Sequence, residues 1–446
     1  MSDKLTLLGG GKAVTTEQGD IFTWPIVTPD HEKAVLGVLR AGAMSQLDIT
    51  REFEEKYARQ YDRKYALSSP NGTASILEAM YALGIGAGDQ VICPGITFWA
   101  SINQAYLLGA SPIFSDVTDD CNIDPNDIER RITPRTKAII VVHYGAMPAD
   151  MDEIMAIAKR HNLKIFEDCS HAHGALYKGK TIGTFGEVAA FSMMSGKSFA
   201  IGEGGIFLTD DRQIYERALL FGHYARHDEI TISQLRRFAG IPCGGHKNRM
   251  NQFSSALGMV QLEYYPKQMA EIDKAMNYFC DLLEGVNGIR PVRPGKDSGT
   301  TKGGWYFPLF RYVPEELGSL SLIRFSKAIQ AEGSICNPGA NSPLHQHPLF
   351  TEMDVFGHGE PTRIAHLDES ASIEQYPESL PVAESINKFI FEIPWFKHYR
   401  PQIIEQHANA YKKVVRNYEC LLADDNEDDD TIGGYTSFFN DQEINA

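Results

Sequence analysis

Residues 191–205 read FSMMSGKSFAIGEGG, and this stretch places one lysine, Lys197, in a glycine-punctuated turn between two strand-like runs. An amine attacks a carbonyl carbon only in its neutral form, and removal from water disfavours the ammonium form. A lysine held among Phe, Met and Gly is therefore a candidate Schiff-base catalyst. Taken alone, the stretch fits a surface lysine on a loop equally well, because most lysines in folded proteins are exposed.

A second stretch, residues 164–175, reads KIFEDCSHAHGA and has the pattern of an apolar strand that ends in acidic and imidazole groups. A carboxylate such as Asp168 could hold a pyridine nitrogen protonated, which pyridoxal 5′-phosphate (PLP) requires of its protein in addition to a lysine. The alternatives are a helix cap or strand-end turn for Asp168 and a zinc site for His171 and His173. No third ligand follows at a spacing typical of zinc, so we predict no metal.

The composition is typical of a large soluble enzyme. The chain has 446 residues, of which 43% are hydrophobic and 22% charged, enough to bury a substantial core in two domains. It has no run of about 18 apolar residues, and its N-terminus lacks the pattern of a signal peptide. The seven cysteines are scattered and odd in number, which indicates reduced thiols. We therefore expect a cytoplasmic protein.

The charge of the chain argues against nucleic-acid binding. The formal net charge is -16, whereas phosphate backbones bind clustered Lys and Arg. Part of this charge is local, because residues 424–430 read DDNEDDD. Such a like-charge block is predicted to be a solvated tail. The aromatic residues within 434–439 are compatible with docking on the body or on a partner subunit, and equally with disorder.

Short apolar runs alternate with helical patterns from about residue 64 to residue 270. Gaps of roughly 20 to 25 residues leave room for crossover helices, so the sheet is predicted to be mostly parallel with helices on both faces. An apolar helical stripe follows Asp150, a candidate helix cap. A strand-like run at 305–310 belongs to a later region of different character. The predicted strands of the large sheet are 90–93, 112–115, 138–142, 164–166, 188–191 and 206–209.

Several short motifs, in combination, resemble those of the DegT/DnrJ/EryC1/StrS family of PLP-dependent sugar aminotransferases. The resemblance extends from about residue 24 to about residue 420. The motifs are Gly72-Thr73 at a helix start, Thr97-Phe98 after a strand, Glu167-Asp168-x-x-His171, Ser192-x-x-x-x-Lys197, Gly202-Glu203-Gly204-Gly205, and Arg249-Met250 before a helix.

The resemblance implies an α/β protein with the type I fold of PLP-dependent transferases, that of aspartate aminotransferase. This fold has a mostly parallel, seven-stranded type of sheet in a large domain, with helices on both faces, and a smaller α+β C-terminal domain. We accordingly expect an N-terminal arm and helices at 1–63, the PLP-binding domain at 64–270, the small domain at 271–422 and an acidic tail at 423–446.

The resemblance also implies the catalytic residues. Lys197 is expected to form the Schiff base with PLP and then to carry protons between the substrate carbon and the cofactor. Asp168 is expected at the pyridine nitrogen and His171 near the 3′-oxygen. Phe98 is expected to stack on the pyridine ring.

The phosphate of PLP has expected partners at a helix start. Free amides and the helix dipole favour an anion there, and the resemblance gives this role to Gly72, Thr73 and the Ser192 hydroxyl. Ordinary capping of the helix by Asn71 or Ser69 is the alternative.

A later loop, residues 244–253, corresponds to the family loop that reaches the phosphate of the neighbouring subunit. Lys247 occupies the position where many relatives have Asn, and Asn248 follows it. Either residue could make the contact. The resemblance therefore implies a homodimer with twofold symmetry and shared active sites.

The expected activity is transfer of an amino group from Glu or Gln to a keto-sugar or keto-cyclitol. Residues 343–350, PLHQHPLF, resemble the cyclitol and aminohydroxybenzoate branch of the family, and His345 is a candidate substrate contact or else a surface histidine. A nucleotide-linked keto-sugar is the alternative acceptor. A PLP-binding sensor or assembly subunit without catalysis is a further alternative. The intact Asp168, His171, Ser192 and Lys197 argue against it.

Overall fold

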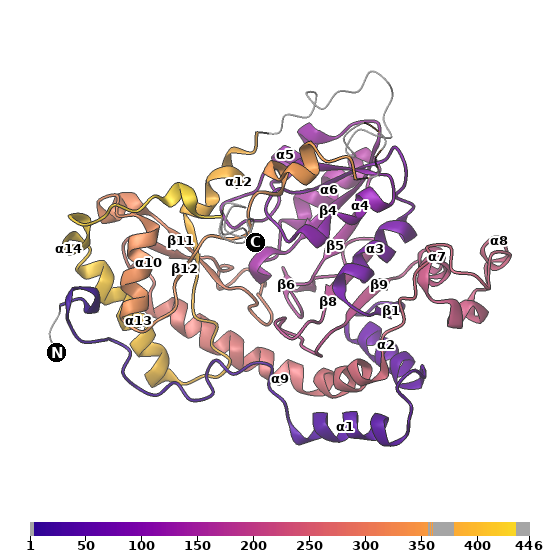
Figure 1. Ribbon diagram of the computed structural model, residues 1–446, viewed down its shortest axis with the longest axis horizontal. Helices are drawn as coiled ribbons and strands as arrows, with labels where there is room; N and C mark the ends of the chain where they lie inside the picture. The colour runs from indigo at the N-terminus through magenta and orange to yellow at the C-terminus, as the bar shows by residue number, and fades with distance from the viewer. Residues whose placement is uncertain (1–3, 356, 358, 360–378, 434–446) are drawn as a thin grey trace, which may run out of the picture.

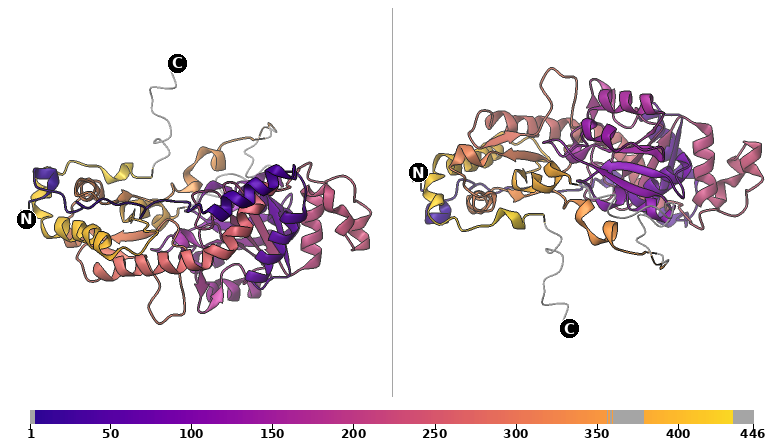
Figure 2. Two further views of the ribbon diagram at one scale, coloured as in Figure 1. Left: turned by 90° about the horizontal axis from the view of Figure 1, so that it is seen from below. Right: turned by 90° about the horizontal axis from the view of Figure 1, so that it is seen from above.

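The computed structural model describes residues 4–355, 357, 359 and 379–433. They form a large domain and a small domain, which lie side by side in Figure 1 with the small domain on the left. One helix of 31 residues, α9 (Gln252–Leu282), runs along both. Figure 2 shows from two further sides that the N-terminal segment follows the small domain before it reaches α1 (Pro29–Arg40).

A seven-stranded sheet organises the large domain, with the strand order β1-β9-β8-β5-β4-β2-β3. β9 is antiparallel to both its neighbours, and the remaining strands are parallel to one another. The predicted mostly parallel sheet is confirmed. The strands are β1 (Tyr65–Ser69), β2 (Gln90–Pro94), β3 (Ser111–Ser115), β4 (Thr136–Val142), β5 (Lys164–Asp168), β8 (Val188–Ser192) and β9 (Gly205–Thr209).

Side chains of the central strands alternate between two hydrophobic layers, because successive residues of a strand face opposite sides of the sheet. Ile139 and Val141 belong to one buried cluster, and Ile140 and Val142 belong to the other. Helices cover both faces, as predicted. These helices are α2 (Asp48–Gln60), α3 (Gly72–Leu83), α4 (Gln104–Leu107), α5 (Pro125–Arg131), α6 (Met151–His161) and α7 (Arg212–Gly222).

One local prediction needs correction. α6 begins after Asp150 as predicted, but the Asp150 carboxylate does not cap the helix, because it accepts a hydrogen bond of 2.6 Å from the Tyr177 hydroxyl. The predicted domain boundary after residue 270 falls inside α9, so the two domains share a continuous helix. α1 and α2 pack on α9 from the large-domain side, and α13 (Pro401–Arg416) packs on it from the small domain.

The small domain has a four-stranded antiparallel sheet in the order β10-β11-β13-β12. The strand-like run predicted at 305–310 forms a strand only from Leu309, because Trp305 and Phe307 both have φ of 55°. This left-handed conformation breaks an extended strand. The remaining elements are β6 (Leu176–Tyr177), β7 (Lys180–Thr181), β10 (Ile289–Pro291), β11 (Leu309–Tyr312), β12 (Asn337–Pro338), β13 (Ile390–Glu392), α8 (Ser233–Arg236), α10 (Leu322–Ala331), α11 (Pro348–Thr351), α12 (Pro381–Ser385) and α14 (Glu419–Leu422).

The acidic block at 424–430 is docked on the small domain, contrary to the prediction of a solvated tail. The Asp429 carboxylate accepts hydrogen bonds from the N–H groups of Leu322 and Ile323, at 2.7 and 3.1 Å. Asp425 accepts a bond of 2.7 Å from the Ser321 N–H. The first turn of α10 has unpaired N–H groups and the positive end of a helix dipole, which together bind carboxylates. The aromatic residues within 434–439 lie outside the described residues.

Two general expectations can be compared with the fold. All seven cysteines are free thiols, as predicted. None of the helices within the described ranges is long and apolar enough to cross a membrane.

Replacement of Asp429 with Ala should lower the free energy of unfolding by about 1–2 kcal/mol, because it leaves two N–H groups of α10 unpaired. Urea unfolding followed by circular dichroism measures this change. Asp424→Ala is the matched control, because it removes the same charge from an exposed residue in the same segment. Equal effects of the two substitutions would contradict the docking of Asp429.

Candidate active site

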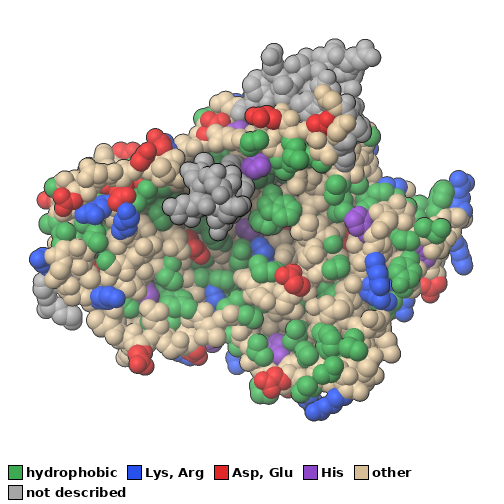
Figure 3. All heavy atoms as spheres, in the orientation of Figure 1, with side chains coloured by type: hydrophobic (Ala, Val, Ile, Leu, Met, Phe, Trp, Pro, Cys, Tyr) green, Lys and Arg blue, Asp and Glu red, His purple; other side chains and the backbone are tan. Residues whose placement is uncertain are grey.

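A cavity of about 360 Å³ lies at the carboxyl ends of the parallel strands, between the large sheet and the small domain. Open α/β sheets bind their ligands at this edge. Figure 3 shows the surface hollowed between the two domains. The lining residues from the large domain include Gly72, Thr73, Phe98, Asp168, His171, Ser192 and Lys197, and those from the small-domain side are Tyr306, Phe307, Ala340 and Asn341.

Lys197 lies in the loop between β8 and β9, and its ammonium nitrogen is 4.2 Å from the centroid of the Tyr306 ring. Only 9% of the residue is exposed. Burial lowers the pKa of Lys197 to about 8, and the Asp168 carboxylate opposes part of this shift. The neutral amine is therefore far more populated near neutral pH than it is for a lysine in water.

The main chain at Lys197 is held by the N-terminal segment. The indole nitrogen of Trp24 donates a hydrogen bond of 2.9 Å to the carbonyl oxygen of Lys197. On the next residue, the Ser198 hydroxyl donates a bond of 3.1 Å to the hydroxyl of Tyr265 on α9, whose own proton goes to the His173 carbonyl oxygen. Trp24 had no predicted function, because its role depends on a contact across 173 positions of sequence.

Asp168 ends β5, and both of its carboxylate oxygens are fixed. One accepts a hydrogen bond of 2.7 Å from the Ser101 hydroxyl, and the other accepts a bond of 3.1 Å from the Ser170 N–H. The side chain lines the cavity although the residue is only 4% exposed. A carboxylate in this position is suited to pair with a protonated ring nitrogen.

The two predicted histidines have different roles. His171 Nδ1 accepts a bond of 3.3 Å from the Gly145 N–H, which leaves the proton on Nε2. Burial lowers the pKa of His171 well below its usual value, and the charge of Lys197 lowers it further, so the ring is a neutral donor. His173 does not line the cavity: its two nitrogens bond the Ser192 carbonyl oxygen and the Tyr57 hydroxyl, at 2.7 and 3.2 Å.

The start of α3 combines both roles considered for it. The Asn71 side chain caps the helix by accepting a bond of 2.9 Å from the Ala74 N–H. The N–H groups of Gly72 and Thr73 have no acceptor in the described part of the chain, and both residues line the cavity. A side chain at Gly72 would lie 2.6 Å from the Cβ atom of Ser192, so only glycine permits this close approach. The cavity thus has free donors suited to an anion.

Three predicted site residues lie outside the cavity lining. Asn248 is buried, and its side-chain nitrogen donates a bond of 2.7 Å to Glu78 of the same subunit. Lys247 is exposed and has no partner among the described residues. His345 is buried, and its Nε2 pairs with Glu384 at 3.0 Å. Sequence reasoning missed Tyr306 and Asn341, which line the cavity without any local motif.

The sequence between residues 25 and 362 matches the DegT/DnrJ/EryC1/StrS aminotransferase family. The chain belongs to this family. Its cofactor is PLP.

Relatives of known name support this membership over nearly the whole chain. L-glutamine:2-deoxy-scyllo-inosose aminotransferase of Micromonospora echinospora is 30% identical, with 95% of this chain and 99% of that protein covered. GDP-perosamine synthase of Escherichia coli is 39% identical, with 69% and 80% covered. Among solved structures, an aminotransferase from Psychrobacter cryohalolentis has a TM-score of 0.76 and 29% identity, with 89% of this chain and 99% of that chain covered.

The cavity of this aminotransferase fits PLP. The free N–H donors at α3 and the Ser192 hydroxyl, which has no partner among the described residues, provide for a phosphate. Asp168 provides for the ring nitrogen and Lys197 for the carbonyl carbon. Phe98 lines the cavity and leaves 48% of its surface exposed, so its ring is available to stack on a ligand.

Position, and not a lowered pKa alone, distinguishes Lys197 from two other buried lysines of the aminotransferase. Burial lowers the pKa of Lys302 to about 8 and that of Lys397 to about 6. Their amines donate to the main-chain oxygens of Val292 and Trp395, at 2.9 and 3.2 Å. Neither residue lines the cavity. Among the described lysines, only Lys197 combines a lowered pKa with a position in the cavity lining.

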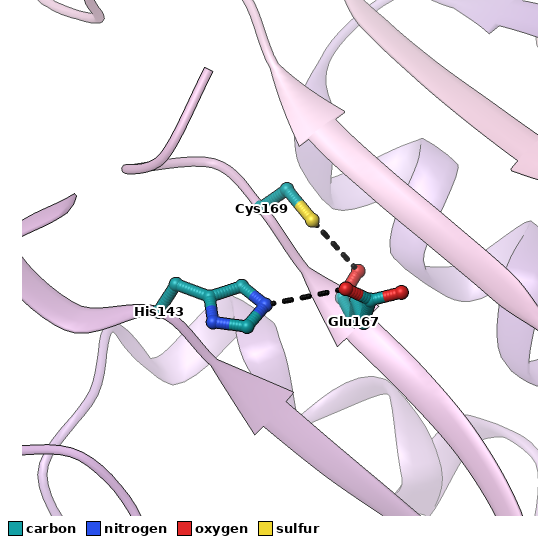
Figure 4. A group of neighbouring side chains, drawn as sticks. All are labelled: His143, Glu167 and Cys169. Atoms are coloured by element: carbon teal, nitrogen blue, oxygen red, sulfur yellow. Dashed lines mark hydrogen bonds and ion pairs between the residues drawn. The ribbon is translucent and has the colours of Figure 1, made fainter. Parts of the chain in front are cut away.

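A second polar cluster, below the cavity, contains His143, Glu167 and Cys169, whose ligand atoms lie within 4.8 Å of one another (Figure 4). His143 Nδ1 accepts a bond of 3.1 Å from the Ala149 N–H, so its Nε2 carries the proton and faces Glu167 at 3.4 Å. Burial raises the pKa of the Cys169 thiol well above its usual value. We assign this cluster a structural role, in which His143 faces the Glu167 carboxylate. The Glu167 carboxylate also accepts main-chain bonds from Gly183, Phe185 and Gly186.

We expect Lys197 in the cofactor-free protein to titrate near pH 8, against about 10.4 for a lysine in a model peptide. Competitive acetylation across a pH series, followed by peptide mass spectrometry, measures its titration. Asp168→Asn should move the midpoint further down, because the carboxylate favours the ammonium form. A midpoint above pH 10, or an upward move in the variant, would contradict the assigned environment.

Proposed function

We propose that this protein transfers the amino group of L-glutamine, or of L-glutamate, to a keto-cyclitol or keto-sugar. The observation that carries this proposal is the buried Lys197 amine in a cavity that also presents Asp168 and the free donors of α3. The glutamine-dependent cyclitol aminotransferase described above aligns with nearly the whole chain, which supports a cyclitol-type acceptor and glutamine as donor. We propose the cytoplasm as its location, because all seven cysteines are free thiols.

A nucleotide-linked keto-sugar is the second candidate acceptor. GDP-perosamine synthase supports it through a higher identity, 39%, over a shorter part of the chain. A non-catalytic sensor has no comparable support, because Asp168, Ser192 and Lys197, which the proposed amino transfer requires, all line the cavity.

When bound, PLP supplies an electrophilic carbon and a ring that accepts the electron pair of the substrate carbon. Lys197, as a neutral amine, would hold the cofactor at that carbon and would move a proton to and from the substrate carbon. The Asp168 carboxylate would keep a proton on the ring nitrogen. The Nε2–H of His171 is a neutral donor in the cavity lining.

A half-reaction tests this function. The protein loaded with pyridoxamine phosphate should regain the absorbance of the carbonyl form when a keto-cyclitol or free keto-sugar is added. Lys197→Ala should slow this step at least about 10³-fold, because it removes the proton carrier. The fold should persist, because the lost side chain opens onto a cavity. Reaction with nucleotide keto-sugars alone would favour the second candidate, and no reaction with any of them would contradict the function.

We propose in addition that the protein is a homodimer with twofold symmetry in which Lys247 reaches the phosphate of the neighbouring subunit. The segment 231–250 contains no acidic residue, in a chain whose net charge is -16. Phe238 and Ile241 in this segment are 55% and 79% exposed. Figure 1 shows α8, which belongs to it, standing away from the body of the large domain. The Asn248 side chain bonds Glu78 of its own subunit. Of the two candidate residues, Lys247 is therefore the one whose side chain is available to contact the partner.

Complementation tests the shared site. A Lys197→Ala protein and a Lys247→Ala protein, each nearly inactive alone, should recover activity when mixed. In a mixed dimer, one site has its own Lys197 and an intact loop from the partner. Random exchange gives up to about a quarter of native activity, by counting sites in a twofold assembly. No recovery, with exchange of subunits verified by mass spectrometry, would contradict the shared site.

A further inference from the structure

The small-domain wall of the cavity contains a short loop after β12, with Ala340 and Asn341 facing the site. Asn387 fixes the main chain of this loop on both sides. Its side-chain oxygen accepts a bond of 2.6 Å from the Ala340 N–H, and its side-chain nitrogen donates a bond of 3.2 Å to the Asn341 carbonyl oxygen. The position of Asn341 is therefore set by a residue that is itself buried.

The C-terminal segment supports this arrangement from behind. Ile432 packs against Gly339, where an added Cβ would lie 2.7 Å from the Ile432 side chain. Gly433 approaches the side-chain nitrogen of Asn387 so closely that no larger residue fits there. The residues that follow the docked acidic block thus contact Asn387, which holds the loop of Asn341.

The hydroxyl of Tyr144 determines which way the Asn341 carboxamide points. This hydroxyl accepts a bond of 3.1 Å from the Asn341 main-chain N–H and donates a bond of 2.7 Å to the Asn341 side-chain oxygen. The hydroxyl proton is given to the carboxamide oxygen, which therefore faces Tyr144. The NH2 group of Asn341, with two donors, has no partner in the described part of the chain and remains available to a ligand in the cavity.

The surroundings of Asn341 suit a polyhydroxylated ring. Tyr306 and Phe307 line the cavity together with Asn341, and the Tyr306 ring packs against His171 with 4.6 Å between centroids. Asn341 therefore shares a wall with the residues beside Lys197. Aromatic faces accept the apolar face of a sugar or cyclitol ring, and a neutral amide donor suits a hydroxyl or carbonyl oxygen better than a phosphate, which favours cations.

We propose that the Asn341 carboxamide donates a hydrogen bond to an oxygen of the keto acceptor and so selects acceptors that carry an oxygen at this place. Tyr144 and Asn387 are positioning residues that act through Asn341. The inference rests on the proposed transfer to a keto-cyclitol or keto-sugar, and it adds the group that recognises the acceptor.

Two substitutions separate the donor from its support. Asn341→Asp keeps an acceptor for Tyr144 but removes both N–H donors, and Asn341→Ala removes the donors without adding charge. Both should raise the KM for the keto acceptor about tenfold or more in the half-reaction. The KM for glutamine in the Asn341→Ala protein should stay within about twofold of the native value, because Asn341 is proposed to contact only the acceptor. Asn337→Ala is the matched control, because its exposed carboxamide bonds Glu392 instead.

Equilibrium binding provides a second readout. In a Lys197→Ala background loaded with pyridoxamine phosphate, calorimetry measures binding of the acceptor without turnover. Asn341→Ala should weaken this binding about tenfold. For a deoxy acceptor that lacks the recognised oxygen, the same substitution should have no effect, which is the signature of a direct contact in a double-mutant cycle.

The outcomes distinguish the two proposals. Suppose that the native protein transfers amino groups to a keto acceptor, and that the Asn341→Ala protein binds every acceptor and deoxy acceptor with the native affinity. The assignment of Asn341 is then overturned and the function stands. If the Asn341→Ala substitution slows the half-reaction with glutamine and the half-reaction with the acceptor equally, Asn341 has only a structural role and the assignment is also overturned. If the native protein transfers to no keto-cyclitol and no keto-sugar, the proposed function fails and the assignment fails with it.

Discussion

The removal of the Lys197 amine from water, next to one carboxylate, is the constraint on which the site depends. Burial lowers its pKa to about 8, and Asp168 keeps it from falling further. The amine is thus neutral often enough to attack a carbonyl carbon and basic enough to accept a proton afterwards. Trp24 holds its main chain, and Ser101 holds the carboxylate, so the pair keeps its geometry without a ligand.

Both ends of the described chain contribute to this geometry from a distance. The N-terminal segment follows the small domain and reaches Lys197 through Trp24. The segment that ends at Gly433 packs on Asn387, which holds the loop of Asn341. Because α9 runs through both domains, the sheet edge and the small-domain wall belong to one connected framework. The cavity is preorganised by contacts that are mostly remote from it in sequence.

The sequence predicts what is local. Six of the seven strands of the large sheet follow from short apolar runs, whereas β1 was not among the predicted strands. Gly72, Asp168 and Lys197 stand in compact motifs. Tyr306 and Asn341 could not be predicted, since only the fold brings them to the cavity. The run at 305–310 has the composition of a strand, but Trp305 and Phe307 have left-handed backbone, which no composition pattern reveals. The acidic block was predicted to be solvated because a charge pattern does not include its partners, which are the main-chain N–H groups of α10.

Reduction of the PLP-loaded protein with sodium borohydride, followed by peptide mass spectrometry, tests the central claim most directly. The reagent makes the bond between cofactor and lysine permanent, so the modified peptide identifies the lysine. Lys302 and Lys397 are informative competitors, because burial also lowers their pKa values. We predict one modified peptide, containing Lys197. Modification at Lys302 or Lys397, or none at Lys197, would contradict the account.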